Sequence, residues 1–143
     1  GAPGTGKTEA ARHLARLLNR ELYVVDMAEL VDSKLGQTQK NVVGLFKSIN
    51  LISFPDKILV LFDEIDSLAL DRTNPNDFRE MGRVTSTFLT ELDNLNPNVV
   101  LVATTNLFKC FDKALTRRFD FVVNFDRYTN EDLIQIAEKL MDS

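Results

Sequence analysis

The opening segment of the chain constrains its fold more than any other part of the sequence. Residues 1–8 read Gly1-Ala2-Pro3-Gly4-Thr5-Gly6-Lys7-Thr8, with glycines, a lysine and a hydroxyl residue at the spacing of a phosphate-binding loop. In such a loop, backbone N–H groups surround the phosphates, the Lys7 ammonium reaches the outer phosphates and the Thr8 hydroxyl ligates Mg²⁺. We therefore expect residues 1–8 to bind a nucleoside triphosphate at the start of a helix.

Beyond this loop, the hydrophobic spacing alternates between that of helices and that of strands. A strand ordinarily precedes such a loop, and we expect that this first strand is absent from the chain. Strands alternating with helices indicate βαβ units, and hence an α/β fold with a mainly parallel sheet between helical layers and ligands at the carboxyl ends of the strands. The expected helices cover 8–19, a segment starting near Gln37, a segment around 81–92 and a last one over 129–140; the expected strands cover 22–25, 58–62, 99–103 and 121–125, and residues 70–77 are expected to form a mobile loop.

A pair of carboxylates follows the apolar run 58–62. Placing Asp63 and Glu64 directly after a buried strand costs free energy unless a cation or a reaction uses them. We expect Asp63 to hold Mg²⁺, usually through water, and Glu64 to polarise the water that attacks the γ-phosphate. An acidic start of an ordinary loop is the alternative for such a pair taken by itself.

Together these segments resemble the AAA family of ATPases over nearly the whole chain, and within it most of all the stand-alone bacterial members. The resemblance implies a P-loop NTPase fold, a three-layer αβα sandwich whose first strand is central in the sheet. Residues 1–128 would be the large nucleotide-binding domain without that strand, and residues 129–143 the first helix of a truncated helical lid. The segments that match in order and approximate spacing are Ala2-Pro3, Phe62-Asp63-Glu64-Ile65-Asp66, Ala103-Thr104-Thr105-Asn106, Asp112-Lys113-Ala114-Leu115 and Arg117-Arg118-Phe119-Asp120.

The resemblance also implies roles for residues that composition and spacing alone would leave unassigned. Asn106 falls at the sensor position, where its amide would orient the attacking water or touch the γ-phosphate. Arg117 and Arg118 resemble the arginine fingers that neutralise charge at the nucleotide of the next subunit. The usual Arg-x-Gly-Arg-Phe-Asp is shortened here to residues 116–120, so the division of labour between the two arginines stays open.

Lys34-Leu35-Gly36 stand where many family members carry a pore loop that threads polypeptide. The aromatic residue of that loop is absent here. Leu35 could still grip an extended chain, whereas a simple turn before the next helix is the alternative explanation for Gly36 and for the whole segment.

The function implied by the resemblance is hydrolysis of ATP to ADP and phosphate, with Mg²⁺, in a ring that is commonly a hexamer and that remodels a macromolecular partner, most often a protein. Two alternatives stay open. A nucleotide-gated scaffold or loader would turn ATP over slowly or not at all. A phosphate-loop GTPase or small-molecule kinase is disfavoured, because the sequence has no Asn-Lys-x-Asp motif and because the Asp63-Glu64 pair suits attack by water.

Composition limits the binding partners and the cellular compartment that we expect for the protein. The 17 basic and 21 acidic residues give a net charge of -4, which argues against nucleic acid as the direct substrate. A single cysteine, Cys110, permits neither an internal disulfide nor a zinc cluster, so we expect a reducing cytoplasm. The sequence contains no membrane segment, since no apolar stretch approaches the length that spans a bilayer.

Overall fold

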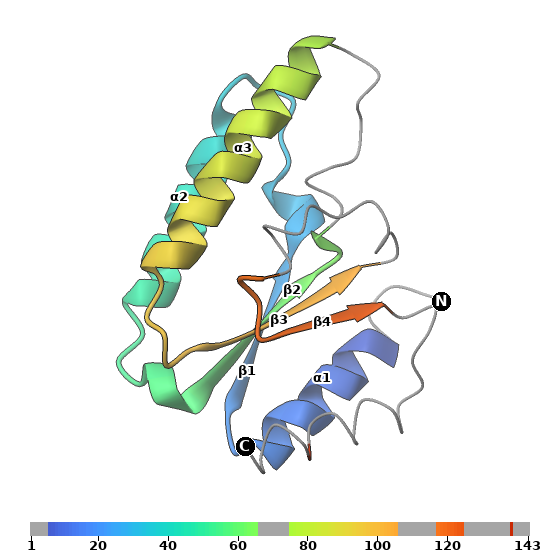
Figure 1. Ribbon diagram of the computed structural model, residues 1–143, viewed down its shortest axis with the longest axis vertical. Helices are drawn as coiled ribbons and strands as arrows, with labels where there is room; N and C mark the ends of the chain where they lie inside the picture. The colour runs from blue at the N-terminus through green and yellow to red at the C-terminus, as the bar shows by residue number, and fades with distance from the viewer. Residues whose placement is uncertain (1–5, 66–74, 106–116, 125–137, 139–143) are drawn as a thin grey trace.

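A computed structural model describes residues 6–65, 75–105, 117–124 and 138 (Figure 1). Within these ranges, the strands form one sheet in the order β1-β2-β3-β4, and every neighbouring pair is parallel. Helices connect β1 to β2 and β2 to β3, as parallel strands require. The elements are α1 (Gly6–Leu17), β1 (Glu21–Asp26), η1 (Met27–Leu30), α2 (Gln37–Asn50), η2 (Pro55–Lys57), β2 (Ile58–Asp63), α3 (Pro75–Asn94), β3 (Val100–Thr105) and β4 (Phe121–Asn124).

The sheet lies between two helical layers (Figure 1). Helix α1 packs on one face, where its small and aliphatic side chains contact Leu59, Leu61 and Val102. Helices α2 and α3 cover the other face, which includes Val60 and Phe62. Strand β2 therefore buries both of its faces, which explains why its sequence is an uninterrupted apolar run rather than an alternating one.

Four phenylalanines form the centre of the core between the sheet and the α2–α3 layer. Phe46, Phe62, Phe88 and Phe119 make five ring contacts with centroids 5.5–6.2 Å apart. Such offset and edge-to-face pairs stabilise a core beyond the area that they bury. Because Phe119 belongs to this cluster, the segment just before β4 is anchored on the core, and with it the position of the two neighbouring arginines.

The Arg20 side chain fixes the direction of α1 relative to the strands. Its Nη1 donates to the backbone carbonyl of Asn98 at 2.7 Å and to that of Ile58 at 2.9 Å. Arg20 follows α1, whereas Ile58 and Asn98 stand at the amino ends of β2 and β3. The carboxyl end of α1 thus lies at the amino ends of these strands, and its amino end lies toward their carboxyl ends (Figure 1).

The expected α/β architecture and its four strands are confirmed. The expected loop over 70–77 is wrong for its last three residues, because α3 begins at Pro75. Proline is tolerated in the first turn of a helix, where its missing N–H has no helical partner to lose. Residues 70–74 and the expected last helix, apart from Glu138, lie outside the described residues, as does the expected domain boundary after residue 128. None of the helices in the described ranges is both long and apolar enough to cross a bilayer.

Candidate functional site

The first turn of α1 carries the end of the predicted phosphate-binding loop. Residues 1–5 lie outside the described residues, and α1 begins at Gly6, so that Thr8 stands in its first turn and is partly exposed. The amino end of a helix presents unpaired N–H groups and a partial positive charge, both of which favour phosphate. This end of α1 lies toward the carboxyl ends of the strands.

Asp63 and Glu64 stand at the carboxyl end of β2. Side chains alternate between the faces of a strand, so Asp63 shares the α1 face with Leu59 and Leu61. Asp63 is the last residue of β2, and both carboxylate residues are partly buried. The expected metal ligand therefore lies on the same side of the sheet as the helix that bears Thr8.

Thr104 of β3 joins the two acidic residues. Its hydroxyl Oγ1 donates to Asp63 Oδ1 at 2.6 Å, and the backbone N–H of Glu64 donates to the same Oγ1 at 2.9 Å. Glu64 has a φ of 56°, in the left-handed region that residues other than glycine seldom adopt. The backbone turns sharply immediately after Asp63, and the Thr104 hydroxyl binds on both sides of that turn.

The donor set fits Mg²⁺ bound together with a nucleotide. Magnesium prefers oxygen ligands and is usually held by one or two carboxylates plus substrate phosphates. A carboxylate has about four lone-pair sites, so the hydrogen bond from Thr104 leaves Asp63 able to accept from a metal-bound water as well. The part of the chain that the structure describes has no group of three or more His, Cys, Asp or Glu side chains that would make a separate metal centre.

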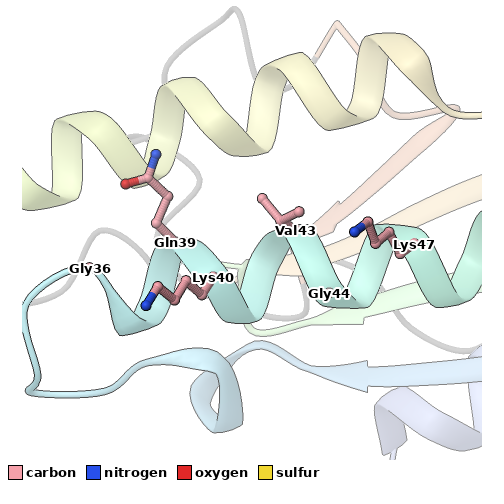
Figure 2. A pocket seen from close by; sticks show the side chains of 6 residues that line it. All are labelled: Gly36, Gln39, Lys40, Val43, Gly44 and Lys47. Atoms are coloured by element: carbon pink, nitrogen blue, oxygen red, sulfur yellow. The ribbon is translucent and has the colours of Figure 1, made fainter.

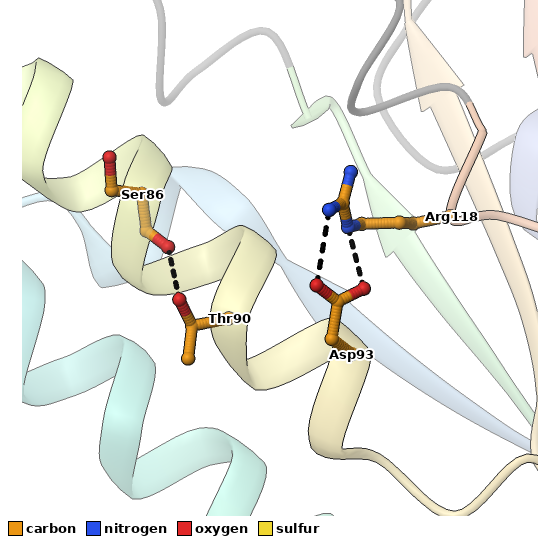
Figure 3. Close-up of polar contacts among 4 residues, drawn as sticks. All are labelled: Ser86, Thr90, Asp93 and Arg118. Carbon is orange, nitrogen blue, oxygen red and sulfur yellow. Dashed lines mark hydrogen bonds and ion pairs between the residues drawn. The ribbon is translucent and has the colours of Figure 1, made fainter.

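The two candidate finger residues, Arg117 and Arg118, differ in their surroundings. Arg118 binds Asp93 of α3 with two hydrogen bonds, Nε to Oδ1 at 2.7 Å and Nη2 to Oδ2 at 3.1 Å (Figure 3). Arg117 is exposed. The structure thus separates an arginine held by its own chain from one that lies at the surface, which the sequence did not resolve. Asn106 lies outside the described residues.

Lys34, Leu35 and Gly36 form a tight turn before α2. Gly36 has a φ of 78°, and the Leu35 side chain is 84% exposed. The Lys34 N–H donates to Asp32 Oδ1 at 2.8 Å, while the Asp32 N–H donates to the hydroxyl of buried Thr38 at 2.9 Å. The turn is therefore fixed by local hydrogen bonds and presents Leu35 to solvent.

An open groove runs along α2 from this turn (Figure 2). It has a volume of about 530 Å³, and its two cationic side chains, Lys40 and Lys47, come from successive parts of α2. Because α2 covers the face of the sheet opposite α1, the groove is separate from Asp63. Sequence reasoning did not anticipate it. The residues that line it are Gly36, Gln39, Lys40, Val43, Gly44 and Lys47.

Two residues with direct contacts to the expected site were not assigned a role from the sequence. Thr104 belongs to a segment that carried the family resemblance, and its place near the end of a strand beside that of Asp63 is a signal that could have found it. Asp93 had no such signal, because its contact with Arg118 joins positions 25 residues apart.

Comparison with known proteins identifies the family. The model of the ATPase family associated with various cellular activities (AAA) matches residues 1–127. The chain belongs to the AAA family of ATPases. This membership confirms the P-loop NTPase fold that the sequence motifs predicted, and it makes the segment around Asp63 and Glu64 part of an AAA domain.

Relatives of this AAA domain occur in bacteria and archaea. An uncharacterised AAA family ATPase of Sinorhizobium fredii is 37% identical over 127 residues, which are 89% of this chain and 37% of that protein. A proposed homologue of a 26S proteasome regulatory subunit from Methanothermobacter thermautotrophicus is 30% identical over 145 residues, covering 100% of this chain and 38% of the relative. The cell division cycle protein 48 homologue of Archaeoglobus fulgidus is 38% identical over 119 residues, 82% of this chain and 16% of the relative. The chain therefore spans well under half the length of these relatives.

Proposed function

We propose that this AAA domain binds ATP with Mg²⁺ and hydrolyses it to ADP and phosphate, in a ring oligomer that remodels a protein partner. The observation that carries the proposal is the position of Asp63 and Glu64. Asp63 ends the buried strand β2 and Glu64 follows it, at the end of the sheet toward which the amino end of α1 lies. Membership of the AAA family supports ATP as the nucleotide.

In this proposal each residue of the site has one role in binding or catalysis. Lys7 and the N–H groups of the loop bind the phosphates, and Thr8 and Asp63 hold Mg²⁺. When bound, Mg²⁺ neutralises charge on the β- and γ-phosphates. Glu64 orients and polarises the attacking water, and Asn106 acts as the sensor beside it. Positioning of this kind accounts for most of the catalysis in phosphoryl transfer.

Arg117 and Arg118 are the reason for proposing a ring oligomer. Arg117 is exposed, so we propose that it reaches the nucleotide of the neighbouring subunit, with Arg118 held beside it by Asp93. An arginine supplied in this way stabilises the charge of the transition state. The partner is proposed to be a protein, because one relative is named for a proteasome regulatory subunit. The exposed Leu35 turn would then contact the substrate.

Substitution of Glu64 tests the proposal in the full-length protein. Glu64→Gln keeps the size of the side chain and removes its basic oxygen, so we expect ATP turnover to fall by about 10²-fold or more, the usual contribution of a general base, while ATP affinity is retained. Glu21→Gln is the matched control, because Glu21 is exposed at the amino end of β1 and should leave turnover unchanged. Turnover in Glu64→Gln equal to that of the wild type would overturn the role of Glu64.

A further inference from the structure

We propose that Thr104 is a positioning residue for ATP hydrolysis, whose hydroxyl sets the relative placement of Asp63 and Glu64. The inference rests on the proposed function, because it gives Thr104 a task only if these two carboxylate residues serve the bound nucleotide. It goes beyond that function by assigning a role to a side chain outside the residues that are proposed to bind the phosphates, Mg²⁺ or the attacking water.

The hydrogen-bond directions at Thr104 are fully determined. A backbone amide can only donate, so Oγ1 accepts from the N–H of Glu64. The single hydroxyl proton is then available for Asp63 Oδ1, which lies 2.6 Å away. Thr104 is 1% exposed, so water does not compete freely for either bond. One buried hydroxyl therefore connects the carboxylate of one residue to the backbone of the next.

The backbone of Glu64 needs such a connection. With a φ of 56°, it occupies a conformation that costs a residue with a Cβ atom free energy, and that persists only where surrounding contacts hold it. The bond from the Glu64 N–H to Thr104 is one of these contacts. Holding this peptide sets the direction in which the Glu64 side chain leaves the end of β2.

Threonine suits this task better than a flexible hydroxyl residue. Its branched Cβ restricts χ1, so that the hydroxyl stays aimed at its two partners. Asp63 and Thr104 are neighbours on parallel strands whose last recorded pair is Phe62 and Ala103, and they share the α1 face of the sheet. The sheet fixes the backbones of the two strands, and the Thr104 hydroxyl fixes the Asp63 carboxylate relative to the Glu64 peptide.

The inference predicts a specific kinetic signature for Thr104→Val, which keeps the shape of the side chain and removes the hydroxyl. We expect kcat to fall by about 10- to 100-fold, the usual effect of misplacing catalytic groups by about 1 Å, and the Mg²⁺ concentration for half-maximal turnover to rise. KM for ATP should change much less. Thr104→Ser, which restores the hydroxyl, should bring kcat to within about 3-fold of the wild type.

The experiment measures kcat, KM and Mg²⁺ dependence in the full-length protein, with a thermal melt of each variant. Thr90→Val is the matched control, because Thr90 is exposed and its hydroxyl donates to the Ser86 carbonyl within α3 (Figure 3). If Thr104→Val melts below the assay temperature, Thr104→Ala replaces it, and the same loss of kcat with rescue by serine is expected.

Glu64→Gln measured in parallel separates the two proposals. If Glu64→Gln abolishes turnover while Thr104→Val and Thr104→Ala keep the wild-type kcat and Mg²⁺ dependence, the role of Thr104 is wrong and the proposed function stands. The role is equally wrong if Thr104→Ser is as impaired as Thr104→Val, because the hydroxyl is then not the active feature. If Glu64→Gln leaves turnover unchanged, the role of Glu64 is wrong, and the role of Thr104 in placing Glu64 is wrong with it.

Discussion

Asp93 and Arg118 form a bidentate ion pair that joins the last turn of α3 to the segment before β4 (Figure 3). Hydrogen bonding from Arg118 is the main reason that the pKa of Asp93 lies below its ordinary value of 3.8; desolvation opposes this shift, and the charge of Arg118 adds a lesser lowering effect. The pair occupies Arg118 within its own chain and leaves its neighbour Arg117 at the surface. The two adjacent arginines therefore have different surroundings, and we expect them to differ in function.

Removing the carboxylate of Asp93 should destabilise the protein in a pH-dependent way. The pKa of Asp93 is lowered in the folded state, so the stabilisation by the pair is complete above 3.8 and is lost as the pH falls below that value through the lowered pKa. We expect Asp93→Asn to unfold at lower urea than the wild type at about pH 7, and this difference to shrink at about pH 3. A difference of equal size at both pH values would contradict the electrostatic origin of the effect.

Arg117 should act across a subunit boundary. We expect Arg117→Ala to lower ATP turnover by on the order of 10³-fold, the usual contribution of an arginine finger, without weakening ATP binding to its own subunit. Mixing Arg117→Ala with Glu64→Gln subunits provides the test. Some mixed sites then combine an intact Glu64 with an intact Arg117 from the neighbour, so turnover should exceed that of either variant by itself. If mixing restores nothing, Arg117 does not act in trans.

The turn that presents Leu35 should depend on Gly36. A φ of 78° strains any residue with a Cβ atom, so Gly36→Ala should lower the free energy of unfolding by about 1–2 kcal/mol. Gly44→Ala is the matched control: Gly44 is exposed within α2, and an added Cβ would meet no atom within 4 Å. Alanine is the better helix former, so this variant should gain about 1 kcal/mol. Urea denaturation of both variants measures the two effects, and the same sign for both would contradict the assigned backbone conformations.

Much of the fold was predictable because the relevant forces act locally along the chain. The apolar run 58–62 indicated a strand buried on both faces, and the structure places one helical layer on each side of β2. The helix expected to start near Gln37 is α2, which begins at that residue and buries Val42, Phe46 and Ile49. The start of α3 at Pro75 was missed, because a proline is compatible both with a loop and with the first turn of a helix.

The contacts of the site were less predictable than its residue types. Asp63 and Glu64 could be named as candidates because carboxylates at the end of a buried apolar strand cost free energy unless a cation or a reaction uses them. The link through Thr104 depends on the register between β2 and β3, and the link from Asp93 to Arg118 depends on where α3 ends relative to β4. Both are set by packing between distant segments, which the spacing of residues within one segment does not encode.

The central claim is that Lys7, Thr8 and Asp63 together form a site for ATP with Mg²⁺. The most direct measurement is a titration of the full-length Glu64→Gln protein with a fluorescent ATP analogue, with Mg²⁺ and with EDTA, repeated after adding Lys7→Ala or Asp63→Ala. The account predicts saturable binding that is tighter with Mg²⁺, a loss of binding in Lys7→Ala, and a loss of the Mg²⁺ effect in Asp63→Ala. Binding that is unaffected by Mg²⁺ and by both substitutions would contradict it.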